Sequence, residues 1–405
     1  MKKKIILILL ALTLTAAMVT TGCESLGGLF GGGDKKDSGK SDKKDTAKAT
    51  KEKEVDDRDT SWYDGKSKET TFYIANDKQL AGFAKLTNLK KPVDFEGKTV
   101  VLTADIDLAE TKWRPTGTFR GTFDGKGFSI SNLTVSGYVN AALFGDVEMA
   151  QIKNVTLYVN KIDSKTSSIS NAGGLIGTGL GVTIENCAVI IKDSITANVE
   201  KTSFAYAGGL AGAIDGVPMF PSYINNCYVS GNVNAVASNG NGSASAGGLV
   251  GMIGLSLMRA VVNINNSYVV GNISATTADS NAFSGGFVAC GGIFETNIKN
   301  SFVSAAVTST VQNSRNGHNT PYLGGFYGRW SSGVNTAAYY NSTKVPTQNM
   351  NSGARDSKTL PTDLIALSDA DMKKQASFKD FDFSSVWAID ATTNGGYPYL
   401  RWQKK

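Results

Sequence analysis

Gly208-Gly209-Leu210-Ala211-Gly212 and Gly247-Gly248-Leu249-Val250-Gly251 are two copies of one motif, a glycine pair followed by a short apolar run. Further pairs begin at Gly173, Gly285 and Gly324, so successive copies lie 35, 39, 38 and 39 residues apart. A fixed period of this length indicates that one supersecondary unit is stacked repeatedly, each unit burying its apolar face against its neighbours. The sequence therefore predicts a repeat architecture.

A second motif runs in phase with the glycine pairs: isoleucine, any residue, asparagine, two further residues, then valine or leucine. Its copies begin at Ile152, Ile184, Ile224, Ile264 and Ile298. Asparagine is a common turn residue, so we expect the chain to change direction there. Stacked copies of this residue would form an amide ladder, in which each side chain hydrogen-bonds to the next. The members of this predicted ladder are Asn154, Asn186, Asn226, Asn266 and Asn300.

The residues that follow each asparagine are predicted to alternate in direction. The first is small or apolar and is expected to point into the core: Val155, Cys187, Cys227, Ser267 and Ser301. The second is aromatic in three consecutive repeats and is expected to point outward: Tyr228, Tyr268 and Phe302. This aromatic ladder is a candidate surface for sugar rings or protein side chains, because aromatic faces stack on both. The alternative is that the rings only stabilise neighbouring coils.

The predicted fold class is all-β, a right-handed parallel β-helix with short helical caps at its ends. The chain has 45 glycines and only eight prolines, with few helical patterns, and parallel coils account best for its continuous apolar inward runs. A helix from Asp77 to Leu86 would close the first coil, and a short helical stretch is expected to begin at Asp369. Residues 396–402 would add an apolar terminal strap.

The N-terminal region reads as an export signal followed by a tether. Residues 1–22 combine a lysine-rich start with an apolar stretch, which is typical of a secretory signal peptide. Gly22 directly before Cys23 resembles a bacterial lipoprotein box, so Cys23 is the predicted lipidation site. Residues 23–60 are predicted to be a disordered charged tether, because residues 31–60 hold nine basic and nine acidic groups with hardly an apolar side chain.

The remaining chain divides into three predicted parts: an N-terminal cap with entry coils at 61–136, the repeats at 137–345 and a C-terminal cap at 346–405. The formal net charge is +6, from 41 basic and 35 acidic residues. Removing the three lysines of the signal leaves 38 against 35, or +3. So small an excess gives no reason to propose nucleic acid as a partner. The predicted contacts are the membrane, through lipid on Cys23, and an unknown glycan or protein ligand.

The cysteines do not form a disulfide framework, because the chain has only four. Cys187 and Cys227 occupy equivalent positions in consecutive repeats. Stacked strands lie about 4.8 Å apart, whereas the Cβ atoms of a disulfide lie about 3.8 Å apart. We therefore predict buried thiols at these two positions, and the sequence offers Cys290 no evident partner.

No catalytic residue, metal ligand or cofactor is predicted. Carboxylates are sparse across the repeats and no pair recurs at a stacking spacing, whereas glycoside hydrolysis needs two facing carboxyl groups. The chain has one histidine, His318, in a polar run that reads as a loop, so a multi-histidine zinc site is not expected. Asp105, Asp107 and Asp124 could hold calcium, but acids in such turns more often accept backbone hydrogen bonds.

An apolar strip is the second candidate partner surface. Several repeats carry apolar insertions after the glycine pair, and stacking in register would align them along one edge of the solenoid. The alternative is that these side chains fold inward or pack on one another. The candidate residues are Met219, Phe220, Leu255, Leu257, Met258, Ile293, Phe294 and Trp330.

The repeats resemble those of bacterial surface proteins that carry the GLUG motif, whose glycine, leucine, apolar, glycine core corresponds to Gly174-Leu175-Ile176-Gly177 here. The stretches 102–108, 113–117 and 119–130 look like the entry coils of such proteins, and 387–389 with 396–400 looks like their closing segment. Ala289-Cys290 departs from the other copies, which continue with glycine. The resemblance implies a β-helix at the bacterial cell surface.

The resemblance implies no single activity, because the motif also occurs in adhesin-like proteins and in accessory regions of IgA-cleaving metallopeptidases. Three hypotheses follow. The first is a lipid-anchored, surface-exposed, adhesin-like recognition module of the cell envelope without catalytic activity. The second is a structural spacer, and the third is a carbohydrate-active enzyme such as a polysaccharide lyase or glycosidase.

Overall fold

The computed structural model describes residues 57–404, apart from 67, 202, 240–241, 255–258, 314–319, 346–350 and 353–360. The predicted signal peptide, the predicted lipidation site Cys23 and most of the predicted tether lie outside the described residues, as does His318. None of the helices in the described part is long and apolar enough to cross a membrane.

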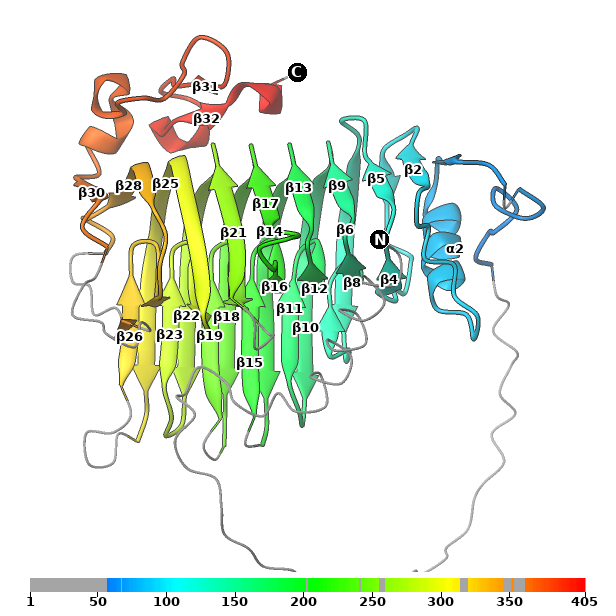
Figure 1. Cartoon of the computed structure of the whole chain (residues 1–405), viewed down its shortest axis with the longest axis horizontal. Helices are drawn as coiled ribbons and strands as arrows, with labels where there is room; N and C mark the ends of the chain where they lie inside the picture. Colours follow the sequence, from blue (N-terminus) through cyan, green and yellow to red (C-terminus); the bar gives the residue numbers. More distant parts are fainter. Residues whose placement is uncertain are drawn as a thin grey trace, which may run out of the picture.

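The described chain is an all-β stack of parallel coils (Figure 1), which confirms the predicted fold class of a β-helix. Each repeat contributes two strands to a 16-stranded sheet and one strand to each of two 6-stranded sheets. Neighbouring strands pair in parallel and in register between equivalent positions of consecutive repeats, as when Val229 lies opposite Val269. The period in the sequence is therefore the length of one coil with its loops.

The large sheet has one column of strands before the asparagine turn and one after it. The first column is β1 (Thr71–Ile74), β2 (Thr99–Leu102), β5 (Thr122–Asp124), β9 (Gln151–Lys153), β13 (Thr183–Glu185), β17 (Ser222–Asn225) and β21 (Ala260–Asn265). The second column is β3 (Ile106–Asp107), β6 (Ser129–Ser136), β10 (Thr156–Thr166), β14 (Ala188–Val199), β18 (Tyr228–Ala237) and β22 (Tyr268–Thr277). The long strand β25 (Phe294–Val311) belongs to both columns and so joins them, and β28 (Asn335–Asn341) and β30 (Leu364–Leu367) extend the sheet beyond it.

The two smaller sheets lie on either side of the glycine pair. The sheet before the pair contains β7 (Asn140–Ala141), β11 (Ser170–Gly173), β15 (Phe204–Gly208), β19 (Ser243–Gly247), β23 (Ala282–Gly285) and β26 (Pro321–Gly324). The sheet after it contains β4 (Thr116–Phe119), β8 (Phe144–Glu148), β12 (Ile176–Leu180), β16 (Ala211–Asp215), β20 (Val250–Ile253) and β24 (Val288–Gly291). A further short pair is formed by β27 (Arg329–Trp330) and β29 (Asn351–Ser352).

The glycine pairs permit close approach of backbones. A Cβ atom on Gly174 would lie 2.5 Å from the carbonyl oxygen of Gly209 in the next coil, and one on Gly173 would lie 2.0 Å from the carbonyl oxygen of Ile176. Any side chain there would push the corner apart. The glycine pairs are therefore required for close packing of the backbone between coils and within each coil.

The ladder asparagines turn the chain, as predicted. All five have left-handed φ angles, between 46° and 56°, a region that asparagine tolerates better than most residues. The next residue then points inward: Val155 is 1% exposed, and Cys187, Cys227, Ser267 and Ser301 are each fully buried. Cys187 and Cys227 are free thiols, as predicted, and burial raises the pKa of the Cys227 thiol well above its usual range.

The helix α2 (Asp77–Thr87) packs at the first coil, as the sequence predicts (Figure 1). Its N-cap is Asn76, whose side chain accepts a hydrogen bond from the backbone N–H of Gln79, so Asp77 is the first helical residue rather than the cap. Phe83 and Leu80 are buried against the first coils. Among the described residues, the helix therefore supplies apolar side chains to the end of the core at the first coil.

The C-terminal segment is more than a cap on the last coil. After β30 it forms η1 (Asp371–Lys373), η2 (Gln375–Ser377), β31 (Trp387–Ala388), η3 (Asn394–Gly396), β32 (Tyr399–Leu400) and η4 (Arg401–Lys404). β31 and β32 pair antiparallel. The segment, orange to red in Figure 1, folds back along the flank of the stack, and its last turn reaches the coil of Asn226, where Trp402 donates to the Asn226 carbonyl. We call residues 369–404 the C-terminal strap.

Candidate functional site

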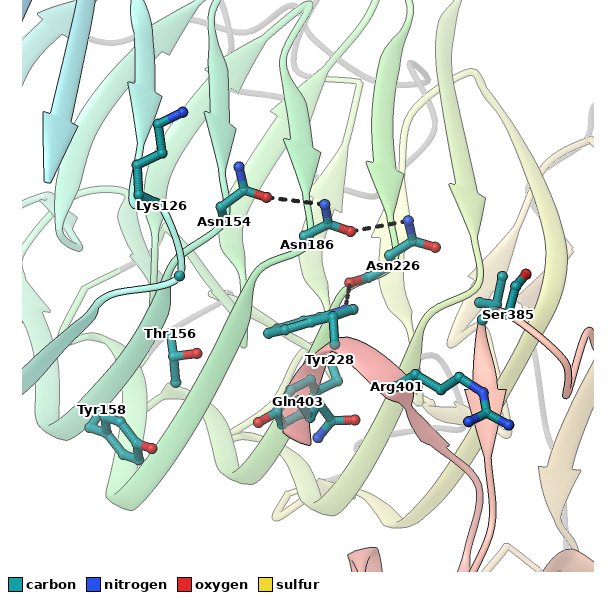
Figure 2. Close-up of a pocket in the computed structure, with 13 residues that line it drawn as sticks. Lys126, Asn154, Thr156, Tyr158, Asn186, Asn226, Tyr228, Ser385, Arg401 and Gln403 are labelled. Atoms are coloured by element: carbon teal, nitrogen blue, oxygen red, sulfur yellow. Dashed lines mark hydrogen bonds between the residues drawn. The ribbon is translucent and has the colours of Figure 1, made fainter. Parts of the chain in front are cut away.

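A cleft of about 720 Å³ lies between the asparagine turns and the C-terminal strap (Figure 2). The coils contribute Lys126, Gly127, Asn154, Thr156, Tyr158, Asn186, Asn226 and Tyr228. The strap contributes Ser385, Val386, Arg401, Trp402 and Gln403. The cleft therefore brings together residues from the start of the repeats and from the end of the chain.

The asparagine ladder runs along one side of this cleft. The Nδ2 atom of Asn186 donates to Oδ1 of Asn154 at 3.1 Å, and Nδ2 of Asn226 donates to Oδ1 of Asn186 at 3.1 Å. Figure 2 shows the three side chains in this order. Each amide nitrogen carries two hydrogens and the ladder uses one. The cleft therefore presents a row of amides with one coil spacing between neighbours.

A buried carboxylate holds the first amide of the ladder. Asp124 Oδ1 accepts from Asn154 Nδ2 at 3.0 Å and from the backbone N–H of Lys126 at 3.0 Å. The Lys126 ammonium lies 3.3 Å from Asp124 Oδ2. Burial opposes ionisation of this carboxyl, but the hydrogen bonds and Lys126 outweigh burial and lower the pKa of Asp124. Asp124 is therefore charged at neutral pH and its charge is balanced by Lys126.

The strap supplies an aromatic wall. The indole Nε1 of Trp402 donates to the backbone carbonyl of Asn226 at 3.0 Å, and its ring centroid lies 5.9 Å from that of Tyr228. Next to it, Gln403 Nε2 donates to the hydroxyl of Tyr268 at 2.9 Å. Tyr158 is 43% exposed on the coil side. Three aromatic rings, those of Tyr158, Tyr228 and Trp402, and a row of amides thus line one cavity, a combination that suits ligands with both apolar faces and hydroxyl groups.

Arg401 brings a positive charge to the strap side of the cleft. Its guanidinium donates to the backbone carbonyl of Phe383 at 2.5 Å, and no carboxylate lies within ion-pair distance of it among the described residues. The guanidinium is exposed. It has five N–H donors, so donors remain for a ligand.

The aromatic ladder is outward-facing but covered, which corrects the expectation of a partner surface. Tyr228, Tyr268 and Phe302 stack with centroids 4.9 and 5.0 Å apart. They are 8%, 1% and 0% exposed, because the strap packs its own apolar side chains on them, including Trp387 and Phe378. The three rings stabilise the strap and the neighbouring coils, and only Tyr228 also lines the cleft.

The apolar strip is not a continuous exposed surface in the described structure. Met219 and Ile293 are 71% and 56% exposed, whereas Phe294 is fully buried. The Phe294 ring lies over Gly291, where a Cβ atom would be 2.2 Å from its Cδ1. Phe220 is half-buried, and Trp330 is partly buried against the core. Leu255, Leu257 and Met258 lie outside the described residues, so they stay a prediction.

Two carboxylates share the outer face of β8, a pairing that the sequence reading missed. Asp146 Oδ1 accepts from Asn140 Nδ2 at 2.8 Å and from Thr178 Oγ1 at 2.5 Å, and Glu148 Oε2 lies 2.5 Å from Arg120 Nη2. Burial and the nearby Glu148 charge together raise the pKa of Asp146 above its usual range. Side chains alternate along a strand, so residues two apart lie on one face. The spacing of Asp146 and Glu148 could therefore have indicated this pairing from the sequence.

The acids considered for calcium accept hydrogen bonds from their own chain. Asp105 Oδ1 accepts from the backbone N–H of Ser129 at 2.7 Å, and Asp107 Oδ1 accepts from Asn132 Nδ2 at 2.7 Å. The bond from Asn132 lowers the pKa of Asp107. Within the described ranges, no three histidine, cysteine, aspartate or glutamate side chains gather closely enough to hold a metal ion.

No protein-family model matches the chain. Among proteins of known sequence, it is 27% identical to "Halomucin" of Haloquadratum walsbyi over 165 residues, which cover 38% of this chain. The match spans only 2% of the length of that much longer protein. The similarity therefore transfers no activity to this chain.

Among solved structures, the fold is similar to a "putative immunoglobulin A1 protease" from Bacteroides ovatus. The match has a TM-score of 0.56 and 20% sequence identity, and it covers 82% of this chain and 92% of that one. At this identity the likeness supports the β-helix fold alone. The likeness extends over most of both chains.

Proposed function

We propose that this protein is a non-catalytic recognition module of the bacterial cell envelope that binds a glycan in the cleft between the asparagine ladder and the C-terminal strap. One observation carries the proposal: a row of amide groups, an exposed tyrosine and a tryptophan line a single cavity of about 720 Å³. Sugars present hydroxyl groups at their edges and C–H groups on their faces, and this lining offers partners to both.

The position of the cleft supports recognition of an extended ligand. Its lining spans the coils of Lys126, Asn154, Asn186 and Asn226, so equivalent groups recur along the axis of the stack. A chain of sugar units can use such a repeated row, because each unit meets the same kind of donor. The strap then provides one wall that the repeats alone do not have.

The envelope location rests on the N-terminal sequence. A lysine-rich start, an apolar stretch and Gly22-Cys23 favour export and lipidation at Cys23, so residues 24–60 would tether the module to the membrane. Mass spectrometry of the mature protein tests this part: a lipid mass on an N-terminal Cys23 supports it. An unmodified N-terminus at another residue contradicts it.

The binding proposal is tested by probing a glycan array with the full-length chain and then with Tyr158→Ala. We expect binding to at least one glycan class and its loss in the variant. Tyr73→Ala is the matched control, because Tyr73 is 59% exposed but does not line the cleft. Absence of any glycan binding would favour the structural spacer. Cleavage of a bound glycan, seen as shorter products by mass spectrometry, would favour the enzyme instead.

A further inference from the structure

We propose that the ligand of this cleft is an extended anionic glycan whose acidic groups, carboxylate or sulfate, contact Lys126 and Arg401. This inference rests on the proposed function and names its ligand class. Of the residues that line the cleft, two are basic and none is acidic. A neutral glycan does not require this excess of basic residues, because amides and backbone groups without net charge can bind its hydroxyl groups.

The two basic residues differ in their surroundings. The Lys126 charge is balanced by Asp124, whose side chain is only 7% exposed, so Asp124 itself is largely shielded from a ligand. The Lys126 side chain is 58% exposed, so its ammonium can contact either the Asp124 carboxylate or an acidic group of the ligand. The guanidinium of Arg401 has no acidic partner among the described residues, and the hydrogen bond it makes there goes to the carbonyl of Phe383. The cleft therefore carries a net positive charge, most of it at Arg401.

Asp382 is an acid of the strap close in sequence to the cleft residues Ser385 and Val386, and its carboxylate is hydrogen-bonded within its own turn. Its carboxylate accepts from the backbone N–H groups of Ser384 and Ser385 at 2.8 and 3.0 Å. It also accepts from both hydroxyl groups, at 2.5 Å each. With four donors on two oxygens, this charge is largely satisfied within its turn. It forms no ion pair with the guanidinium of Arg401 in the described part of the chain.

The placement of the two cations sets the length of the ligand. In Figure 2, Lys126 lies beyond the Asn154 end of the row of asparagines, and Arg401 lies on the strap toward the Asn226 end. The coils of Lys126 and Asn226 are three steps apart, and stacked strands are separated by about 4.8 Å, so the row is about 14 Å long. A single sugar cannot span that distance and contact both cations. An oligosaccharide with acidic groups on separate units can, and its intermediate units would lie along the amides.

The test measures the affinity of the full-length chain for polygalacturonate oligomers of one to six units, for dextran sulfate and for neutral dextran, by isothermal titration calorimetry. We expect affinity to rise with oligomer length, to fall with added salt and to be absent for dextran. Lys126→Gln and Arg401→Gln should each weaken binding about tenfold, the loss of one hydrogen bond to a charged group. Lys112→Gln and Arg114→Gln, exposed residues outside the cleft, are the charge-matched controls and should bind as the unmodified chain does.

The ligands and variants together distinguish a failure of the inference about charge from a failure of the proposed function. Binding of dextran sulfate but not polygalacturonate assigns the acidic group as sulfate and supports the anionic class. Binding of a neutral glycan that is lost in Tyr158→Ala but unaffected by Arg401→Gln overturns the inference about charge and leaves the proposed function standing. Acidic glycans bound equally by all variants would show unspecific attraction and overturn the site. Unchanged melting temperatures of the glutamine variants verify that losses are not due to unfolding.

Discussion

Trp402 Nε1 donates a hydrogen bond to the backbone carbonyl of Asn226 at 3.0 Å, although the two residues are 176 positions apart in the chain. This bond fixes the end of the strap to the turn that also carries the third amide of the ladder. One wall of the cleft therefore depends on a contact between the end of the chain and a coil in the middle of the repeats. The strap is thus a condition for the site as well as a cover for the aromatic ladder.

The first prediction concerns this bond. Trp402→Phe retains an aromatic ring but removes the Nε1 donor, and the loss of one such hydrogen bond is worth about 1 kcal/mol. We expect faster amide hydrogen exchange in residues 398–404 and little change in the repeats. Trp402→Ala, which also removes the ring, should increase exchange further. Equal exchange in all three proteins would show that the indole does not hold the strap.

The second prediction is a pH dependence of strap docking through Asp369. Hydrogen bonds from Tyr397 and Lys373 lower the pKa of Asp369 to about 2, and Asn341 Nδ2 also donates to it at 2.7 Å. A carboxyl whose pKa is lower in the folded state stabilises that state above its unfolded pKa of about 3.9. This stabilisation is lost as the pH falls from about 4 toward 2. Trp387 and Trp402 fluorescence should report release of the strap in this range.

Asp369→Asn isolates this effect from those of other acids, since Asp382 and Asp390 also have lowered pKa values. The variant keeps an acceptor oxygen but has no charge, so its strap should be less stable at pH 6. The difference from the unmodified chain should shrink toward pH 2. A difference that stays constant with pH would contradict the assignment to Asp369.

The third prediction separates the two roles of a ladder asparagine. Asn186 has a φ of 50° and takes part in two ladder hydrogen bonds. Asn186→Gly permits the left-handed turn and removes the side chain with its amide, which should lower the free energy of unfolding by about 1 to 3 kcal/mol. Asn186→Leu adds the cost of a left-handed φ, about 1 to 2 kcal/mol more. Urea unfolding measures both; if Leu were no worse than Gly, the turn would not be strained.

Much of the fold could be predicted from the sequence, because its determinants are local and repeated. Asparagine at the turn and paired glycines at the corner each meet one backbone requirement, and the repeat places them in register. The burial of Cys187 and Cys227 followed from the same register. These features need no knowledge of how distant parts of the chain meet.

The candidate site could not be predicted, because its two walls are far apart in sequence. Alternation correctly directs Tyr268 outward, but it cannot tell an exposed outward residue from one covered by the strap. The cleft residues Arg401 and Gln403 carry no motif, and they gain a role only where the strap docks. Phe294 was misjudged for a related reason: it begins the long strand β25 and pairs with Ala260, so it belongs to the core rather than to a loop.

The fourth prediction follows from that correction. Phe294 is fully buried and its neighbour Ile293 is 56% exposed. Phe294→Ala should lower the free energy of unfolding by about 3 to 5 kcal/mol, the usual cost of removing a buried aromatic ring. Ile293→Ser should change it by no more than about 0.5 kcal/mol. Thermal unfolding compares the two variants directly. A larger loss of stability in Ile293→Ser than in Phe294→Ala would contradict the burial of Phe294 and favour its place in the exposed strip.

The fifth prediction is a pH-dependent gain in stability on replacing Asp146. Burial is the main cause of its raised pKa, and the charge of Glu148 adds to it. A carboxyl with a raised pKa in the folded state destabilises that state once the pH exceeds its unfolded value of about 3.9, and this penalty is complete above the folded pKa. Asp146→Asn cannot ionise and still offers an oxygen to Asn140 and Thr178. The variant should therefore gain stability relative to the unmodified chain between pH 4 and pH 7 in urea unfolding. Asp193→Asn, at a carboxylate that is 64% exposed, serves as the control. If the stability difference between Asp146→Asn and the unmodified chain were the same at pH 4 and at pH 7, ionisation of the Asp146 carboxyl would not be destabilising.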